Sequence, residues 1–178
     1  MNVSRAARAL LSAEPVPGRL ERCDELSDDV TVLVDYAHTP DALRRVLDAV
    51  RGLSSGKVHC VFGCGGDRAP GKRPTLGAAV GAAADRATIT NDNPRSEDPA
   101  AIARAIEPAL RASGIAYDVV LDRAEAITAA VLRAAPGDVV LLAGKGHEPY
   151  QIFGTEKRPF DDRAAARHAL GLRREGKG

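Results

Sequence analysis

The sequence predicts an α/β protein built on an open, mostly parallel sheet with helices on both faces. Short, continuous apolar runs rich in Val, Ile and Leu alternate with segments in which apolar residues recur at helical spacing. Gly, Pro, Asn and Asp cluster between these segments, where turns are expected. Alternating strands and helices form right-handed βαβ crossovers, which place the strands parallel in one sheet.

Each element follows from the local sequence. The apolar runs predict strands over residues 30–35, 57–62, 87–90, 117–121 and 138–143. The helical spacing predicts helices over residues 40–52, 75–84, 99–112, 123–134 and 162–171. Thr39 and Asp98 are each followed by proline, the residue order of a capped helix start. After the last strand we expect a short extended stretch with a turn at Gly154.

The length allows one good hydrophobic core, with room for a short appendage, in 178 residues. Residues 2–13 form a short amphipathic segment, and a run containing two prolines and a glycine, residues 14–18, interrupts it. We therefore interpret residues 1–25 as a lead-in segment or linker and residues 26–178 as the domain itself.

Composition narrows the class of protein. The net charge of +1 gives no broad positive field, and aromatic residues make up only 3%, so we expect neither nucleic acid nor membrane as a partner. No apolar run approaches the ~20 residues that cross a bilayer, and no secretion signal begins the sequence, so we expect a cytoplasmic location. The three cysteines have no paired spacing, which favours free thiols and predicts no metal site.

Polar or glycine-rich loops follow four of the predicted strands. They contain Asp35 with His38, residues 63–73, residues 92–95 and residues 144–148. Because parallel strands end at the same edge of a sheet, we expect these loops to surround one crevice. Asp92, Asn93 and Arg95 offer a carboxylate, an amide and a guanidinium, and Pro94 fixes the turn between them. With the acid Glu148, this combination suits a ligand that carries both an ammonium and a carboxylate.

Several familiar motifs are absent or incomplete. The glycines of residues 63–66 permit close approach to a ligand, but a tight turn explains them equally well. The sequence lacks the Gly-x-Gly-x-x-Gly fingerprint, which disfavours a nicotinamide-dependent oxidoreductase, and it contains no Gly-x4-Gly-Lys-Ser/Thr phosphate loop. The cations Arg68, Lys72 and Arg73 fit a solvated face as well as a site, with Arg68 the better candidate. His147 lacks a partner that would set its pKa, so we assign no catalytic residue.

Five segments together resemble the Mur ligases, in particular those members that add meso-diaminopimelate. They are VDYAHTPDAL (34–43), FGCGGDR (62–68), GKRP (71–74), DNPR (92–95) and GKGHE (144–148). The resemblance runs in order from about residue 16 to the end of the sequence. Any one motif is a weak signal, whereas the ordered set is specific.

The resemblance implies a fold, an activity and a set of site residues. The fold is the Rossmann-like C-terminal domain of these enzymes. The activity is ATP-dependent addition of meso-diaminopimelate to UDP-MurNAc-L-Ala-D-Glu, a step of peptidoglycan precursor synthesis. The diaminopimelate site would be formed by Arg68, Asp92, Asn93, Pro94, Arg95, Gly144 and Glu148. Nucleotide contacts would come from Arg19, Asp35 and, less strongly, His38.

The same family is built from three domains, and this sequence resembles the last. ATP and Mg²⁺ would therefore be bound mainly by a central domain, and the UDP end of the substrate by an N-terminal domain. Residues 1–25 would then lead in from that central domain, and the chain alone would be inactive. Because no phosphate loop occurs here, a stand-alone small-molecule-binding module, or an inactive remnant of a Mur ligase, is the alternative interpretation.

Overall fold

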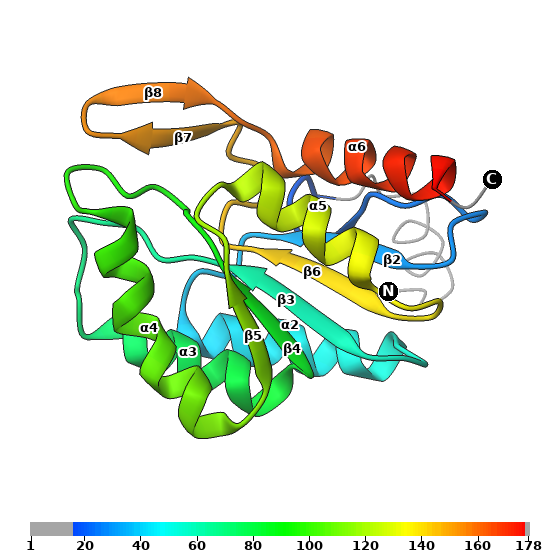
Figure 1. The fold of residues 1–178 in the computed structure, drawn as a ribbon, viewed down its shortest axis with the longest axis horizontal. Coiled ribbons are helices and arrows are strands. Elements are labelled where there is room, and N and C mark those ends of the chain that lie inside the picture. The colour runs from blue at the N-terminus through cyan, green and yellow to red at the C-terminus, as the bar shows by residue number, and fades with distance from the viewer. Residues whose placement is uncertain (1–15, 177–178) are drawn as a thin grey trace, which may run out of the picture.

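The computed structural model describes residues 16–176, so the amphipathic segment predicted over residues 2–13 lies outside the described residues. These residues form a six-stranded sheet with helices on both faces, and a separate two-stranded hairpin projects beyond one end of the sheet (Figure 1). The predicted fold class is confirmed.

The elements follow one another in a regular strand–helix order. The strands of the main sheet are β1 (Glu21–Arg22), β2 (Thr31–Asp35), β3 (Val58–Phe62), β4 (Arg86–Ile89), β5 (Ala116–Val119) and β6 (Val139–Ala143). The hairpin is β7 (Tyr150–Phe153) and β8 (Glu156–Pro159), with Gly154 in its turn. The helices are α2 (Pro40–Leu53), α3 (Lys72–Ala83), α4 (Pro99–Ser113), α5 (Arg123–Arg133) and α6 (Asp162–Glu175).

The order of the strands places β6 in the middle of the sheet. It reads β1-β2-β6-β3-β4-β5, and every neighbouring pair is parallel except β1 with β2. Strand β1 was not predicted, because two charged residues carry no apolar pattern; it pairs as Glu21 with Val34 and Arg22 with Leu33. The boundary at residue 25 stays a prediction, although β1 joins the sheet of the domain.

Alternate residues of the central strands enter two separate apolar layers. Leu33 of β2 and Leu141 of β6 pack with α2, α3 and α4, whereas their neighbours Val32 and Val140 pack with α5 and α6. Figure 1 shows these two helical layers on opposite sides of the sheet. Burial on both faces explains why the strands read as continuous apolar runs.

Two helices depart from their predicted bounds. Helix α3 begins at Lys72 rather than at residue 75, because Pro74 falls in its first turn, where no backbone N–H is required. Helix α6 continues past Gly171 to Glu175. Its last turn is held by Arg173, which donates to both carboxylate oxygens of Asp29 and to the backbone carbonyl of Val131.

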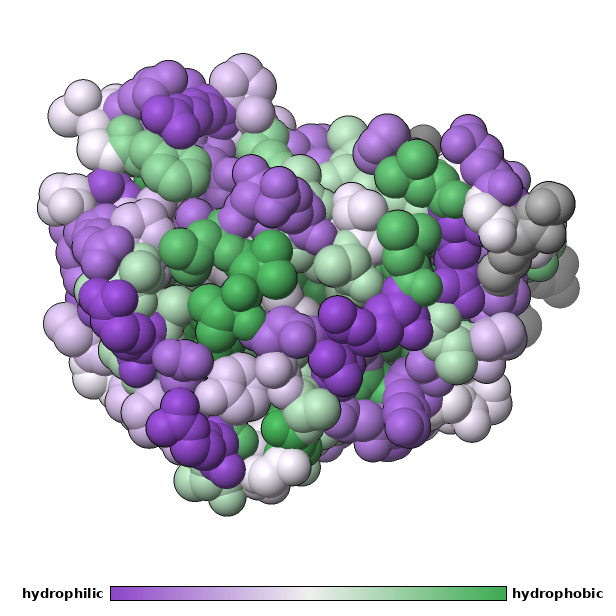
Figure 2. All heavy atoms as spheres, viewed as in Figure 1, coloured by the Kyte–Doolittle hydropathy of each residue, from purple (hydrophilic) through white to green (hydrophobic). Residues whose placement is uncertain are grey.

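One face of the molecule is mainly hydrophilic. Figure 2 shows hydrophilic side chains over most of this face, with hydrophobic side chains gathered in smaller groups. Val119 of β5 and Leu132 of α5 are among the larger apolar side chains that remain exposed. Among the described residues, the structure has no helix long and apolar enough to cross a membrane.

A buried ion pair joins the two helices of one layer to the sheet. Arg123, the first residue of α5, donates through Nε and Nη2 to the two carboxylate oxygens of Asp162, both at 2.7 Å. Its remaining bonds reach the backbone carbonyls of Asn91 and Ala143, at 3.2 and 3.0 Å. Both side chains are fully buried. The guanidinium therefore links the segment that follows β4 to the end of β6, although β3 lies between these two strands in the sheet.

We expect Arg123→Met to lower the free energy of unfolding by about 3–5 kcal/mol, because it leaves the Asp162 carboxylate buried without a counter-ion. Urea unfolding followed by circular dichroism measures the change. Arg104→Met is the matched control, since the Arg104–Asp98 pair is exposed and should contribute less than about 1 kcal/mol. Equal losses in the two variants would contradict the assignment.

Candidate functional site

A cavity of about 340 Å³ opens at the edge where the parallel strands end. Its walls come from the loops that follow β2, β3, β4 and β6 and from the start of α3. The chain leaves β2 and β3 towards one helical layer and leaves β6 towards the other. A crevice at such a reversal is the usual ligand position in an open α/β sheet. The lining residues are Tyr36, His38, Gly63, Cys64, Gly65, Arg68, Ala69, Lys72, Leu76, Asp92, Asn93, Arg95, Gly144 and Glu148.

The segment Asp92–Arg95 (the tetrad) is held from behind by strand β7. Gln151, which is 7% exposed, donates through Nε2 to the backbone carbonyls of Asn91 and Asp92, at 3.2 and 3.1 Å. The next residue, Ile152, donates its backbone N–H to Oδ1 of Asn93 at 3.0 Å. Hydrogen bonds therefore join the β7–β8 hairpin to the loop after β4.

Arg95 is held in a backbone conformation that arginine seldom adopts. Its φ is +53°, in the left-handed region, where non-glycine residues are disfavoured. The hairpin fixes it on both sides, since Arg95 N–H donates to the Ile152 carbonyl at 3.0 Å and Gly154 N–H donates to the Arg95 carbonyl at 2.7 Å. The unusual conformation is therefore stabilised by the neighbouring hairpin.

The guanidinium of Arg95 is open to the cavity on one edge. Its Nη1 donates to the backbone carbonyl of Gly66 at 2.6 Å. Among residues 16–176 no hydrogen bond or ion pair engages Nε or Nη2, and the side chain is half-buried. A side chain at position 66 would collide with the carbonyl of Pro94, so the close approach of the glycine-rich loop to the tetrad requires glycine at this position. The open edge can bind a carboxylate through two parallel hydrogen bonds.

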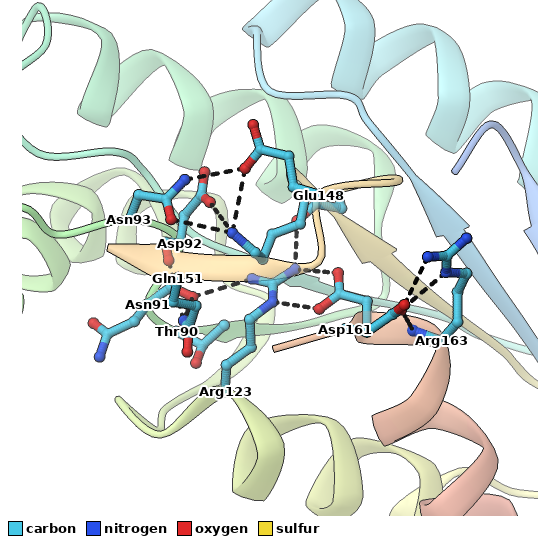
Figure 3. Close-up of polar contacts among 12 residues, drawn as sticks. Thr90, Asn91, Asp92, Asn93, Arg123, Glu148, Gln151, Asp161 and Arg163 are labelled. Atoms are coloured by element: carbon cyan, nitrogen blue, oxygen red, sulfur yellow. Dashed lines mark hydrogen bonds and ion pairs between the residues drawn. The ribbon is translucent and has the colours of Figure 1, made fainter. Parts of the chain in front are cut away.

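Where the loops after β4 and β6 line the cavity, two acids flank a buried ammonium (Figure 3). Nζ of Lys145 lies 3.3 Å from Oδ1 of Asp92, 3.2 Å from Oδ1 of Asn93 and 3.4 Å from Oε2 of Glu148. Asn93 in turn donates through Nδ2 to the same Glu148 oxygen at 3.1 Å. Asp92 is 8% exposed and Glu148 is half-buried, and both line the cavity. This wall is therefore acidic and the Arg95 wall is cationic.

The three cations of the glycine-rich loop divide into two groups. Arg68 and Lys72 are exposed and line the cavity. Arg73 is 5% exposed and instead donates through Nη2 to Glu97 at 2.7 Å. Arg73 therefore ties the loop to the approach of α4, and its positive charge is not offered to a ligand.

An aromatic group with cationic neighbours lies beside the cavity at the end of β2. The Arg19 guanidinium is 4.9 Å from the centre of the Tyr36 ring, and the His38 and His147 rings are 4.7 and 5.5 Å from it. Asp35 is 7% exposed, and its carboxylate accepts the backbone N–H groups of Leu20 and Ala37, at 2.9 and 2.8 Å. Asp35 therefore secures the backbone that carries these rings.

Most of the predicted site residues meet at the cavity. Those that line it are Arg68, Asp92, Asn93, Arg95, Gly144, Glu148 and His38. Those that do not are Pro94, Arg19 and Asp35. Tyr36 and Lys72 also line the cavity; neither was predicted to do so, although both lie within matched motifs. Lys145 and Gln151 were also missed, because a buried lysine and a strand glutamine have no distinctive local pattern.

A second hollow, of about 440 Å³, lies at the opposite edge of the sheet. Two of its cations are already paired, since Arg86 and Arg133 both donate to Asp118. Within residues 16–176 no group of His, Cys, Asp and Glu side chains has the arrangement of a metal site. His59 in this hollow is 5% exposed and hydrogen-bonded to Thr88, which indicates a structural role.

Burial, followed by the charges of Arg86 and Arg133, lowers the pKa of His59 from 6.5 to about 4. Between these two values the unfolded chain binds more protons than the folded chain, so the free energy of unfolding falls as the pH falls from 6.5 towards 4.

We therefore expect His59→Gln, whose amide can still bond Thr88, to reduce this fall, which is at most about 1.4 kcal/mol per pH unit. Urea unfolding across the pH range measures it. The two proteins should show the same dependence above pH 7, where His59 is neutral in both states. Parallel curves below pH 6 would contradict a neutral, buried His59.

The chain is similar to proteins of one known family. Residues 18–146 match the family described as "Mur ligase, glutamate ligase domain". A relative from Prochlorococcus marinus, a "UDP-N-acetylmuramoyl-L-alanyl-D-glutamate--2,6-diaminopimelate ligase", is 49% identical over 165 residues, which cover 93% of this chain and 33% of the relative. A relative with the same name from Synechococcus elongatus is 54% identical over 158 residues, covering 89% and 32%.

A solved structure of a ligase with that name matches this chain with a TM-score of 0.84 and 40% identity. The match covers 91% of this chain and 33% of the chain in that structure. The chain thus spans about a third of the length of the relatives that it matches.

Proposed function

The chain belongs to the Mur ligase family, and on that premise we propose that it is the C-terminal, amino-acid-binding domain of a ligase that adds meso-diaminopimelate to UDP-MurNAc-L-Ala-D-Glu. The order of the five motifs and the names of relatives at about half identity support this assignment. The substrate and the activity of the complete ligase are part of the proposal, because the match covers only a third of those relatives.

The observation that carries the proposal is that one cavity is lined both by Arg95 and by the acids Asp92 and Glu148. Diaminopimelate bears an ammonium and a carboxylate at each end, whereas lysine lacks the distal carboxylate. The open edge of Arg95 matches a carboxylate, and Asp92 and Glu148 match an ammonium. With lysine bound, the guanidinium would lose its carboxylate partner, which disfavours that ligand. Arg68, Asn93 and Gly144 complete the proposed site, and Pro94 fixes the turn of the tetrad.

The family forms amide bonds at the expense of ATP. In the proposed reaction the D-glutamate side-chain carboxylate is phosphorylated, and the diaminopimelate nitrogen then attacks the acyl carbon and displaces phosphate. This domain binds and orients the attacking amine. We assign Arg19 and His38 to nucleotide contacts, since both lie with Tyr36 in a group suited to a flat heterocycle. Asp35 supports them by holding the backbone. Mg²⁺ and most of the ATP contacts are assigned to other domains.

We expect the chain to bind meso-diaminopimelate more tightly than L-lysine, and Arg95→Lys to remove most of that preference, because an ammonium lacks the two parallel donors of a guanidinium. A site that hydrogen-bonds a polar group of its substrate can discriminate against an analogue without that group by a factor of up to roughly 10⁴–10⁵. Isothermal titration with both amino acids measures the ratio.

Arg104→Lys, on the exposed face of α4, should leave the preference unchanged. Equal binding of the two amino acids by the unaltered chain would refute the proposed substrate.

A second candidate, a stand-alone binding module or inactive remnant, rests on one observation: this sequence contains no Gly-x4-Gly-Lys-Ser/Thr run. We expect the purified chain to form no UDP-MurNAc-tripeptide alone and to form it when mixed with the N-terminal and central domains of a homologous ligase. Detection of the tripeptide by mass spectrometry distinguishes the candidates. Mixtures that remain inactive, while the intact homologue is active, would favour the remnant.

A further inference from the structure

Lys145 is a fully buried lysine that lies behind the cavity and does not line it. Its ammonium has three close oxygen neighbours, on Asp92, Asn93 and Glu148, and it lies 5.6 Å from the centre of the Tyr150 ring (Figure 3). All three oxygen-bearing side chains line the cavity. Burying an ammonium is unfavourable unless its partners compensate, so these contacts fix the lysine and its partners together.

Lys145 contributes to the orientation of the Asn93 amide. Oδ1 of Asn93 accepts from Lys145 Nζ and from the Ile152 backbone N–H, and Nδ2 donates to Glu148. The opposite orientation would direct the amide N–H groups at an ammonium and at another N–H donor. Lys145, the Ile152 N–H and the Glu148 carboxylate therefore favour the same orientation of this amide, in which its donor side faces Glu148.

The lysine also offsets the repulsion between the two acids. Asp92 and Glu148 share Lys145 as a counter-ion, and without it two carboxylates would face the same small space. With it, the three groups together carry one negative charge, which matches one ligand ammonium. Glycines with positive φ flank the lysine, 112° at Gly144 and 52° at Gly146, and this turn directs its side chain behind the wall.

We propose that Lys145 is a positioning residue of the amino-acid site, which holds Asp92, Asn93 and Glu148 in the arrangement that receives the ligand ammonium. The inference rests on the proposed function for the identity of the ligand. Lys145 itself makes no ligand contact, because the residues that it organises lie between it and the cavity. In metal sites, removal of residues that support the ligands typically changes affinity or activity by roughly 10–100-fold, and we expect an effect of that order here.

The test uses Lys145→Met, which keeps the length of the side chain without its charge, and Lys145→Arg, which keeps the charge. We expect Met to weaken meso-diaminopimelate binding by about tenfold or more and Arg to restore a large part of the loss, measured by isothermal titration. Affinity for a non-hydrolysable ATP analogue, measured in a ligase assembled with the other domains, should not change.

A second readout needs no ligand. The side-chain amide of Asn93 should give a distinct, slowly exchanging pair of signals in ¹H–¹⁵N spectra of the unaltered chain and of Lys145→Arg, and should lose its protection in Lys145→Met. The control is Arg173→Met, which removes another buried, ion-paired cation far from the cavity. It should lower stability without changing the Asn93 signals or the amino-acid affinity.

The outcomes separate the inference from the proposed function. Unchanged Asn93 signals and unchanged affinity in a folded Lys145→Met protein would overturn the positioning role. A loss of affinity that Arg173→Met reproduces would also overturn it, since destabilisation would then explain the effect. If the unaltered chain and the assembled ligase both fail to bind diaminopimelate, the proposed substrate is wrong, and the amide signals still decide the role of Lys145.

Discussion

The buried Arg123–Asp162 pair is the interaction on which the geometry of the site depends. The arginine reaches the carbonyls of Asn91 and Ala143, which immediately precede Asp92 and Gly144. One guanidinium therefore sets the spacing of two loops that belong to different strands and face the same cavity. Because charges are expensive to bury, such a pair contributes more to a unique arrangement than to net stability. The residues of the acidic wall follow in sequence shortly after the carbonyls that Arg123 binds.

Local sequence predicted the fold because β2, β3, β4 and β6 are buried on both faces and the helices on one, so that burial appears as periodicity. The motif residues around Asp92 and Glu148 were predictable from loop chemistry at strand ends and from the family resemblance. Strand β1 was not, because a charged pair of residues becomes a strand only through its partner β2. Lys145, Gln151 and Arg73 were missed for the same reason: their roles come from partners distant in sequence.

Rigidity is the common property of the residues that face the cavity. Arg95 keeps a disfavoured backbone conformation because the hairpin bonds it on both sides, and Asn93 keeps one amide orientation because its oxygen and its nitrogen both have partners. Binding groups that are already in position lose little conformational entropy when a ligand arrives, so more of the contact energy appears as affinity and selectivity. The exposed Arg68 and Lys72 are the exceptions, and they leave the cavity adaptable at its rim.

The central place of β6 has a consequence for how the protein is made. Strands β2 and β3 are not paired with each other, and β6, which is synthesised after β5, lies between them. When only β2 to β5 have been synthesised, the sheet therefore exists as two separate parts, one with β2 and one with β3, β4 and β5. Strand β6 must then insert between β2 and β3 to join them. Until then the loops after β2 and β3 have nothing to face, so binding competence arrives only with the completed polypeptide.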